Sequence, residues 1–279
     1  MAAMAMAIAL TTALALTAPV EVYAAGDIAD CRRRPASESV AERTAALIPP
    51  GATVLMLGDS VYRYATSEAL ENCYEPTWGI HRPNTWAVAG NHDRVDGSTD
   101  DFQAYFAEGA GEQGYFARRL GGWLVIGLTS DPSFAAADAQ FAWLEATLEE
   151  NRDARCTLAM WHAPLYSSGW HRGSGEHMRP YWALLDRFDA EIVLNGHEHF
   201  YEAFDPLDAA GRPVAEGIRE FVVGTGGAHL FGFWRPPHES RARIKRHGVL
   251  HLTLGEDGYE WEFLDVDGGR ADPGGARCR

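Results

Sequence analysis

Positive charge is scarce in this sequence. Its 279 residues include 24 Lys or Arg against 39 Asp or Glu, which gives a formal net charge of −15 at pH 7. Such an excess of negative charge argues against a protein that binds the phosphate backbone of a nucleic-acid duplex. A small anionic substrate is still compatible with it, because bound metal ions can make one site locally positive inside an acidic protein.

Internal repeats and tracts of low hydrophobicity are also missing. We therefore expect neither a repeat protein nor a long disordered region. With 46% hydrophobic residues, the chain has enough apolar side chains for one large domain or two small ones. Our prediction is a single domain over residues 19–279.

No Lys or Arg precedes the apolar run MAAMAMAIALTTALALTA at the N-terminus, and the first basic residue is Arg32. The run is typical of the apolar core of a secretory signal peptide over residues 1–18, with Ala13-Leu14-Ala15 as a small-residue cleavage pattern. A membrane anchor is the competing interpretation, but the run is barely long enough and is mostly Ala and Thr. We expect a secreted protein, periplasmic or extracellular, without stable membrane insertion.

The four cysteines form no Cys-x-x-Cys pair, a spacing that would indicate a zinc or redox site. Their even number fits the disulfides of an exported protein. Buried free thiols are the alternative interpretation.

Short apolar segments alternate with helical patterns along the chain, which favours an α/β sandwich. Residues 136–150 and 178–188 are predicted helices. The predicted strands are 20–25, 53–57, 85–89, 123–129, 156–160, 191–194, 217–223 and a hairpin of 247–254 with 259–266.

Five of these strands are each followed directly by residues that can bind metals. Taken alone, each such stretch has an ordinary structural interpretation as a turn or a hydrogen-bonded histidine. Their order, each after a strand, favours a functional site, because ligands bind at the carboxyl ends of strands in α/β sheets. The stretches are Gly26-Asp27, Gly58-Asp59-x-x-Tyr62, Gly90-Asn91-His92-Asp93, Trp161-His162 and Gly196-His197-x-His199.

The side chains of this set offer oxygen and nitrogen but no sulfur, which suits Fe, Zn, Mn or Mg. In an extended segment, both rings of His197-x-His199 would point the same way, so that one loop could supply two adjacent metals. The two oxygens of Asp59 could bridge those metals. A site of this kind needs no side-chain nucleophile, because metals can supply hydroxide.

This ordered set resembles the calcineurin-like metallophosphoesterases, and the GDxxY spacing is similar to their purple acid phosphatase branch. Flanking stretches such as CYEPTWG and GIREFVVGTGGA look like bacterial secreted members of the superfamily. The resemblance runs from about Asp27 to His199. It implies a four-layer α/β/β/α sandwich of two mixed sheets around two metal ions, iron with a second divalent metal (Fe, Zn or Mn).

By that resemblance, each metal has four protein ligands and Asp59 belongs to both. The first set is Asp27, Asp59, Tyr62 and His199. The second set is Asp59, Asn91, His162 and His197.

The resemblance also implies two histidines outside the ligand sets. His92 would lie near the leaving group, and a strand-like backbone would turn its ring toward the pocket. His171, nine residues after His162, is similar to a histidine that purple acid phosphatases use for substrate.

The function implied is a secreted phosphatase that hydrolyses small phosphomonoesters by attack of a metal-bound hydroxide. A phosphodiesterase or nucleotidase on the same centre is the alternative within enzymes. A non-catalytic metal- or phosphate-binding protein is the alternative of another class.

The positions of the cysteines relative to the strands suggest their pairing. Cys31 and Cys73 follow the first and second of the metal-site strands, while Cys156 starts a later strand and Cys278 lies near the chain end, free to reach back. We predict Cys31–Cys73 and Cys156–Cys278, one of the three pairings that four cysteines allow.

Overall fold

The computed structural model describes residues 18–131, 133, 137–171, 174–234 and 240–279. The predicted signal peptide over residues 1–18 lies outside this range except for Ala18. Within the described residues, no helix has both the length and the apolar character needed to cross a membrane.

One mixed sheet contains the first strands of the chain together with the C-terminal hairpin. Its order is β15-β14-β13-β1-β3-β5, with β1, β3 and β5 parallel and the other three antiparallel to their neighbours. Its strands are β1 (Val20–Ala25), β3 (Thr53–Met56), β5 (Thr85–Ala87), β13 (Gly248–Leu254), β14 (Gly258–Asp265) and β15 (Arg270–Arg277).

The second mixed sheet has the order β12-β10-β11-β9-β8-β7-β6, in which β7, β8, β9 and β11 are parallel. Its strands are β6 (Phe116–Leu120), β7 (Trp123–Gly127), β8 (Cys156–Met160), β9 (Ile192–Asn195), β10 (Tyr201–Phe204), β11 (Arg219–Val223) and β12 (Ser240–Ile244). A small parallel pair, β2 (Ala29–Asp30) and β4 (Val61–Tyr62), lies beside the first sheet.

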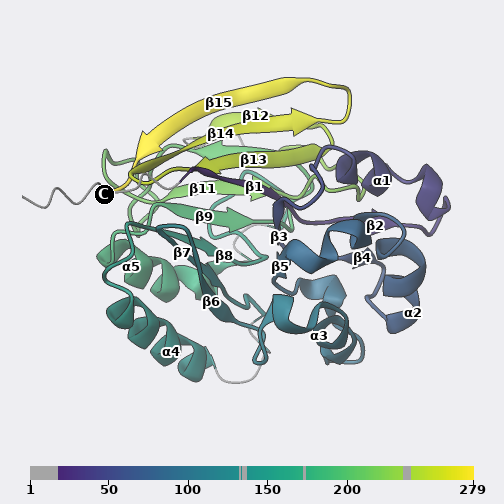
Figure 1. Ribbon diagram of the computed structural model, residues 1–279, viewed down its shortest axis with the longest axis horizontal. Coiled ribbons are helices and arrows are strands. Elements are labelled where there is room, and N and C mark those ends of the chain that lie inside the picture. The colour runs from purple at the N-terminus through teal and green to yellow at the C-terminus, as the bar shows by residue number, and fades with distance from the viewer. Residues whose placement is uncertain (1–17, 132, 134–136, 172–173, 235–239) are drawn as a thin grey trace, which may run out of the picture.

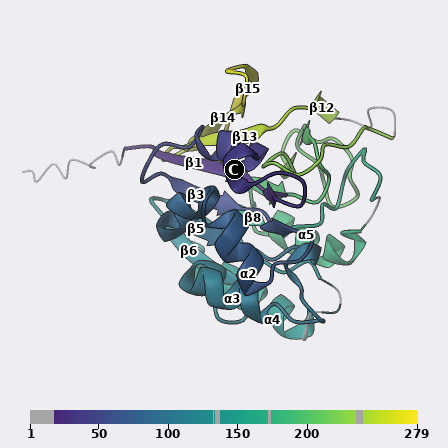
Figure 2. The same ribbon diagram turned by 90° about the vertical axis from the view of Figure 1, so that its right-hand side faces the viewer.

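Helices complete the outer layers (Figures 1 and 2). Among the described residues, α1 (Val40–Ala45), α2 (Ser67–Ala69) and α3 (Asp100–Phe106) lie with the first sheet, and α4 (Ala137–Glu150) and α5 (Arg179–Arg187) with the second. The predicted sandwich of two mixed sheets is therefore confirmed.

Strand β7 is apolar at successive positions because both of its faces are buried. Trp123 and Val125 belong to the core between the sheets, whereas Leu124 and Ile126 pack in the core with α4 and α5. A strand buried on both faces needs apolar side chains at every position.

Most predicted elements are present with shifted ends, and strands 20–25 and 156–160 match residue for residue. Six strands were not predicted: the short pair β2 and β4, and β6, β10, β12 and β15 in the two large sheets. Strand β15 contains Asp272-Pro273-Gly274-Gly275, a composition that usually breaks strands. It forms here because it is an edge strand, where Pro and Gly are tolerated.

Both predicted disulfides are present. Cys31 pairs with Cys73 and Cys156 with Cys278, and no cysteine is free. The first bridge fixes the segment after β2, and the second ties the C-terminus to the start of β8.

Candidate metal centre

The loops after β1, β3, β5, β8 and β9 meet at one edge of the sandwich, because parallel strands end on the same side. These loops bring together all seven of the predicted ligand side chains. The predicted clustering of these residues is therefore observed.

Several of the loop turns have unusual backbone conformations. Asp27, Asp59 and His197 have positive φ angles of 60°, 55° and 70°, which non-glycine residues rarely adopt. A side chain at Gly58 would overlap the His162 ring, and one at Gly90 would overlap the Asp59 carboxylate. Strain and close packing of this kind cluster at functional sites.

The first group of donor atoms surrounds the Tyr62 hydroxyl. Tyr62 Oη lies 2.7 Å from Asp27 Oδ1, 2.9 Å from Asp59 Oδ2 and 3.0 Å from His199 Nε2. Asp27 Oδ1 and His199 Nε2 are themselves 3.0 Å apart. Four donors from the segments after β1, β3 and β9 thus converge on one small volume.

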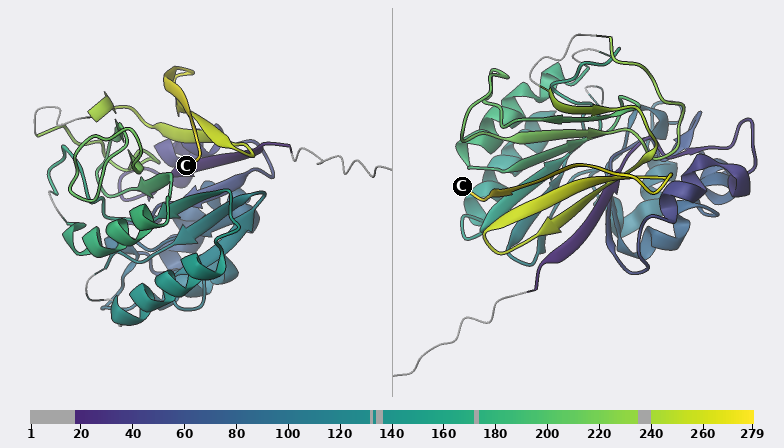
Figure 3. Two further views of the ribbon diagram at one scale, coloured as in Figure 1. Left: turned by 90° about the vertical axis from the view of Figure 1, so that its left-hand side faces the viewer. Right: turned by 90° about the horizontal axis from the view of Figure 1, so that it is seen from above.

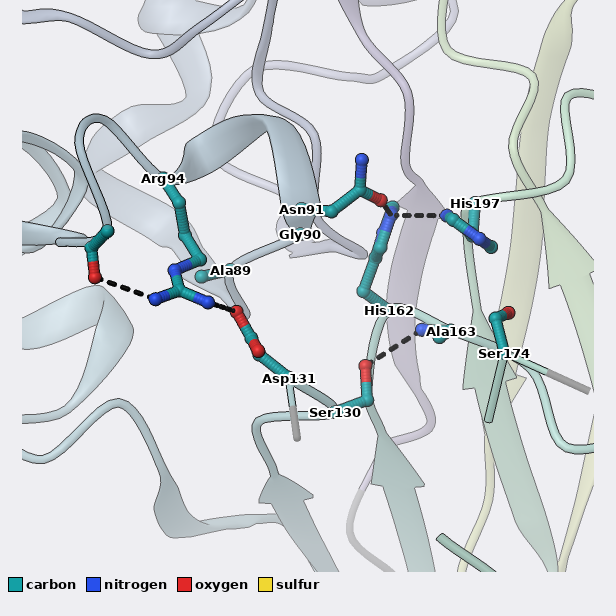
Figure 4. Close-up of a pocket in the computed structure, with 11 residues that line it drawn as sticks. Ala89, Gly90, Asn91, Arg94, Ser130, Asp131, His162, Ala163, Ser174 and His197 are labelled. Atoms are coloured by element: carbon teal, nitrogen blue, oxygen red, sulfur yellow. Dashed lines mark hydrogen bonds and ion pairs between the residues drawn. The ribbon is translucent and has the colours of Figure 1, made fainter. Parts of the chain in front are cut away.

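The second group surrounds the His162 ring (Figure 4). His162 Nε2 lies 3.5 Å from Asp59 Oδ2, 3.2 Å from Asn91 Oδ1 and 3.2 Å from His197 Nδ1. Asp59 Oδ2 is the atom common to both groups.

The spacing of these atoms fits metal binding. Bonds of about 2.1 Å at right angles place neighbouring donors about 3 Å apart, close to the distances observed. Asp27, Asp59 and His162 are buried and form a cluster able to hold an ion. Among the described residues, no Lys or Arg forms an ion pair with either carboxylate. Buried carboxylates normally need a cationic partner, and without a metal ion the protonated rings of His162 and His199 would have to serve.

Backbone carbonyl groups orient two of the rings. His162 Nδ1 lies 2.8 Å from the Leu57 oxygen, and His199 Nδ1 lies 2.7 Å from the His229 oxygen. Each ring therefore donates from Nδ1 and presents Nε2 to the centre, a common arrangement of metal ligands.

Without a metal ion, two of these side chains, Tyr62 and His162, carry protons that would have to leave before the side chains could bind one. Burial and the carboxylates of Asp27 and Asp59 raise the pKa of Tyr62 well above its usual value of 10. Burial opposes a charge on His162, but the Asp59 carboxylate outweighs it and raises the pKa of His162 to about 10. A bound cation would have to displace both protons. By contrast, burial and the neighbouring His162 lower the pKa of His197 to about 3, so this ring is neutral.

The segment of His92 is not strand-like as predicted, because Asn91–Asp93 form a 3-10 turn. The turn is stabilised by Asp93, a residue outside the predicted ligand sets. Its buried carboxylate accepts hydrogen bonds from the backbone N–H groups of Asp59 (2.7 Å), Ser60 (2.9 Å) and Gly90 (2.8 Å). Asp93 thereby fastens two of the site loops together.

The His92 ring nevertheless faces the centre. Its Nδ1 lies 2.7 Å from the Arg63 carbonyl oxygen, and its Nε2 lies 4.0 Å from Asp59 Oδ2. The side chain is 31% exposed, so it can contact a ligand in the pocket.

His171 is also at the centre, with its ring centroid 4.5 Å from that of His197. Glu198, the residue between the two histidines of His197-x-His199, holds it in place. One carboxylate oxygen accepts the His171 backbone N–H at 2.8 Å and the other lies 3.3 Å from Nδ1. The prediction of an extended His-x-His segment is wrong, since His197 is left-handed. In this bent segment, Glu198 is free to turn to His171.

Two pockets flank the centre. One, of about 590 Å³, lies beside Asn91 and His162 and includes the ion pair of Arg94 with Asp131 (Figure 4). The other, of about 670 Å³, lies beside Tyr62, His92, His171 and His199.

A family model described as calcineurin-like phosphoesterase matches residues 20–201. Purple acid phosphatase 1 of Ipomoea batatas is 28% identical over 214 residues, which cover 63% of this chain and 44% of that protein. Purple acid phosphatase 15 of Arabidopsis thaliana is 29% identical over 216 residues, which cover 62% of this chain and 40% of that protein. The chain spans less than half of the length of these two relatives.

Solved structures show a similar fold. The purple acid phosphatase PPD1 of yellow lupin seeds has a TM-score of 0.77 at 18% identity, covering 94% of this chain and 54% of that one. GAP50, described as the anchor in the inner membrane complex of Plasmodium, has a TM-score of 0.74 at 14% identity. The match covers 94% of this chain and 90% of that one.

Proposed function

The chain belongs to the calcineurin-like phosphoesterase family, and we propose that it is a dinuclear-metal phosphatase that hydrolyses small phosphomonoesters. One observation carries the proposal: two groups of oxygen and nitrogen donors share the buried oxygen Asp59 Oδ2. A single carboxylate oxygen between two such groups suits a pair of adjacent metal ions.

The proposed ligands follow these two groups. Asp27, Asp59, Tyr62 and His199 would hold the first ion, and Asp59, Asn91, His162 and His197 the second. From the resemblance to purple acid phosphatases, we propose iron in the first site, with Fe, Zn or Mn in the second. Iron bound to a tyrosinate should give a visible absorption band. The variant Tyr62→Phe should lose that band, and a colourless active enzyme would refute iron.

The charge of such a site suits a phosphate dianion. A trivalent and a divalent ion carry five positive charges, of which Asp27, Asp59 and a Tyr62 anion remove three. Two metal ions at this site would lower the pKa of bound water from 15.7 to about 7, which supplies hydroxide near neutral pH.

The two histidines outside the ligand sets would act on the substrate. We assign His92 to proton donation at the leaving-group oxygen, because its Nε2 faces the pocket while Nδ1 contacts the Arg63 carbonyl. General acid catalysis is typically worth about 10²–10⁴-fold in rate. His171, held by Glu198, would bind a phosphate oxygen.

Hydrolysis of p-nitrophenyl phosphate and of bis-p-nitrophenyl phosphate, each with and without a chelator, tests the proposal. We expect hydrolysis of the monoester that the chelator abolishes. Preferential hydrolysis of the diester would favour a phosphodiesterase. Absence of both reactions in a metal-loaded protein would favour a binding protein.

We also propose that the protein is exported, as the N-terminal run suggests. The two disulfides support this location, since stable disulfides are rare in reducing compartments.

A further inference from the structure

The pocket beside Tyr62 and His199 is unusually rich in arginine. Arg32, Arg33, Arg34 and Arg63 line it, although the whole protein has a net charge of −15. None of these four residues belongs to the predicted ligand sets. All four are exposed and therefore accessible to a ligand.

Among the described residues, three of these arginines form no ion pair with a carboxylate, unlike most of the others. Elsewhere, for example, Arg43 pairs with Asp267 and Arg187 with Glu145. Arg32 also has a partner, because Asp30 accepts hydrogen bonds from its Nε at 2.8 Å and its Nη2 at 2.6 Å. In the part of the chain that the structure describes, no carboxylate lies within ion-pair distance (4.0 Å) of the other three guanidinium groups, those of Arg33, Arg34 and Arg63.

The local charge of the pocket wall is therefore positive even without metal ions. Apart from the candidate ligand Asp59, its acidic residues are Asp30 and Glu38. Four guanidinium groups against these two carboxylates leave a charge of plus two. That charge is additional to the charge of the metal centre.

The fold holds the arginine run next to the candidate ligands. Asp30 lies opposite Tyr62 in the β2–β4 pair, and Cys31 is bonded to Cys73. Arg33 and Arg34 follow this fixed point by two and three residues, which limits how far they can move from the centre.

We infer that Arg33 and Arg34 form a subsite for a second phosphate group, so that the preferred substrates carry two or more phosphates. This inference rests on the proposed function, in which the scissile phosphate occupies the metal centre. Guanidinium groups bind phosphate oxygens through paired hydrogen bonds. Two unpaired guanidinium groups match the charge of one phosphate dianion. The chemical class indicated is a nucleoside diphosphate or another bisphosphorylated compound.

Steady-state kinetics with ADP and AMP test the subsite through its variants, because AMP lacks the second phosphate. The bond that breaks is a phosphoanhydride in ADP and an ester in AMP, so the comparison is between wild type and variants on the same substrate. We expect the wild-type KM to be lower for ADP than for AMP, since Arg33 and Arg34 would bind the second phosphate. Arg33→Gln and Arg34→Gln should each reduce kcat/KM for ADP at least about fivefold more than for AMP. Arg277→Gln is the control, because Arg277 is exposed on β15, outside the pocket, and loses the same charge.

The inference is overturned if the variants lower kcat/KM equally for ADP and AMP, or if Arg277→Gln has the same effect as Arg33→Gln. If neither nucleotide is hydrolysed, p-nitrophenyl phosphate hydrolysis decides the proposed function separately, and the subsite is tested by binding. Calorimetric titration of the metal-loaded protein would then show tighter binding of ADP than of AMP, and equal binding by wild type would refute the subsite.

Discussion

Two buried carboxylates lie at opposite ends of the parallel strands and have very different surroundings. Asp59, 1% exposed, lies where the strands end, and Glu191, 3% exposed, lies where β8 and β9 begin. Glu191 accepts backbone hydrogen bonds from Thr157 at 2.6 Å and from Arg279 at 3.0 Å. One oxygen of Asp59 instead contacts Tyr62 and His162, whose atoms are also potential metal ligands.

The difference shows that burial alone does not mark a functional carboxylate. Glu191 is satisfied by the chain itself and contributes to the structure near the C-terminus. That terminus lies at the end of the molecule opposite α1 and α2 (Figures 1 and 3). Asp59 lies among donor atoms that one or two cations would satisfy together. The two ends should therefore respond differently to metals, mutation and pH.

The largest expected difference comes from neutralising each carboxylate. Asp59→Asn should lower metal content and reduce kcat/KM by about 10²-fold or more, since even residues behind the ligands are worth up to about 100-fold. Glu191→Gln should leave both unchanged. Metal analysis and p-nitrophenyl phosphate hydrolysis measure the two variants. Wild-type turnover by metal-depleted Asp59→Asn would contradict the two-metal account.

The two disulfides provide the second comparison, because Cys31–Cys73 lies near the metal centre and Cys156–Cys278 lies near Glu191 at the opposite end of the strands. They close chain separations of 42 and 122 residues, which correspond to about 4 and 5 kcal/mol of unfolding free energy in the chain-entropy model. Cys31→Ser/Cys73→Ser should also lower metal content, since this bridge adjoins the strand pair that carries Tyr62. Cys156→Ser/Cys278→Ser should only lower stability. Urea unfolding and metal analysis would separate these effects, and metal loss in folded Cys156→Ser/Cys278→Ser would contradict the distinction.

A smaller effect is expected at His92, which borders the centre without joining a ligand group. His92→Ala should retain metal and lose about 10²-fold in kcat on alkyl phosphates, the loss expected for a general acid. The loss should be smaller for p-nitrophenyl phosphate, whose leaving group needs no proton. The control is His251→Ala, on β13 outside both pockets. Equal losses on both substrates would refute the proton donor.

The smallest expected effect is a pH dependence of the unfolding free energy, caused by Glu191 at the end of the molecule away from the metal centre. Burial raises the pKa of Glu191 from 4.5 to about 7, so the folded state binds more protons than the unfolded state between these values. The unfolding free energy should therefore fall as pH rises through this range, with a limiting contribution of about 1.4 kcal/mol per pH unit.

Glu191→Gln should remove this contribution. Denaturant unfolding of wild type and variant at pH 5, 6 and 7 measures it, because titration of the metal-site groups cancels in the difference. Parallel stability curves for the two proteins would show that Glu191 does not titrate in this range.

The candidate ligands were predictable because parallel strands bring their carboxyl ends to one edge, whatever the intervening loops do. The roles of Asp93 and Glu198 were not, because they depend on a 3-10 turn and a left-handed residue that have no clear sequence signal. The position of Arg33 and Arg34 depends on the β2–β4 pair and the Cys31–Cys73 bridge. Strand β15 was missed because its edge position, which tolerates Pro and Gly, is a property of the whole sheet.

The most direct test of the account is the metal content of purified, active protein, determined by inductively coupled plasma mass spectrometry beside p-nitrophenyl phosphate turnover. The account predicts two metal ions per chain, loss of activity when both are removed, and recovery when both are restored. Full activity with one metal ion or none per chain would contradict it.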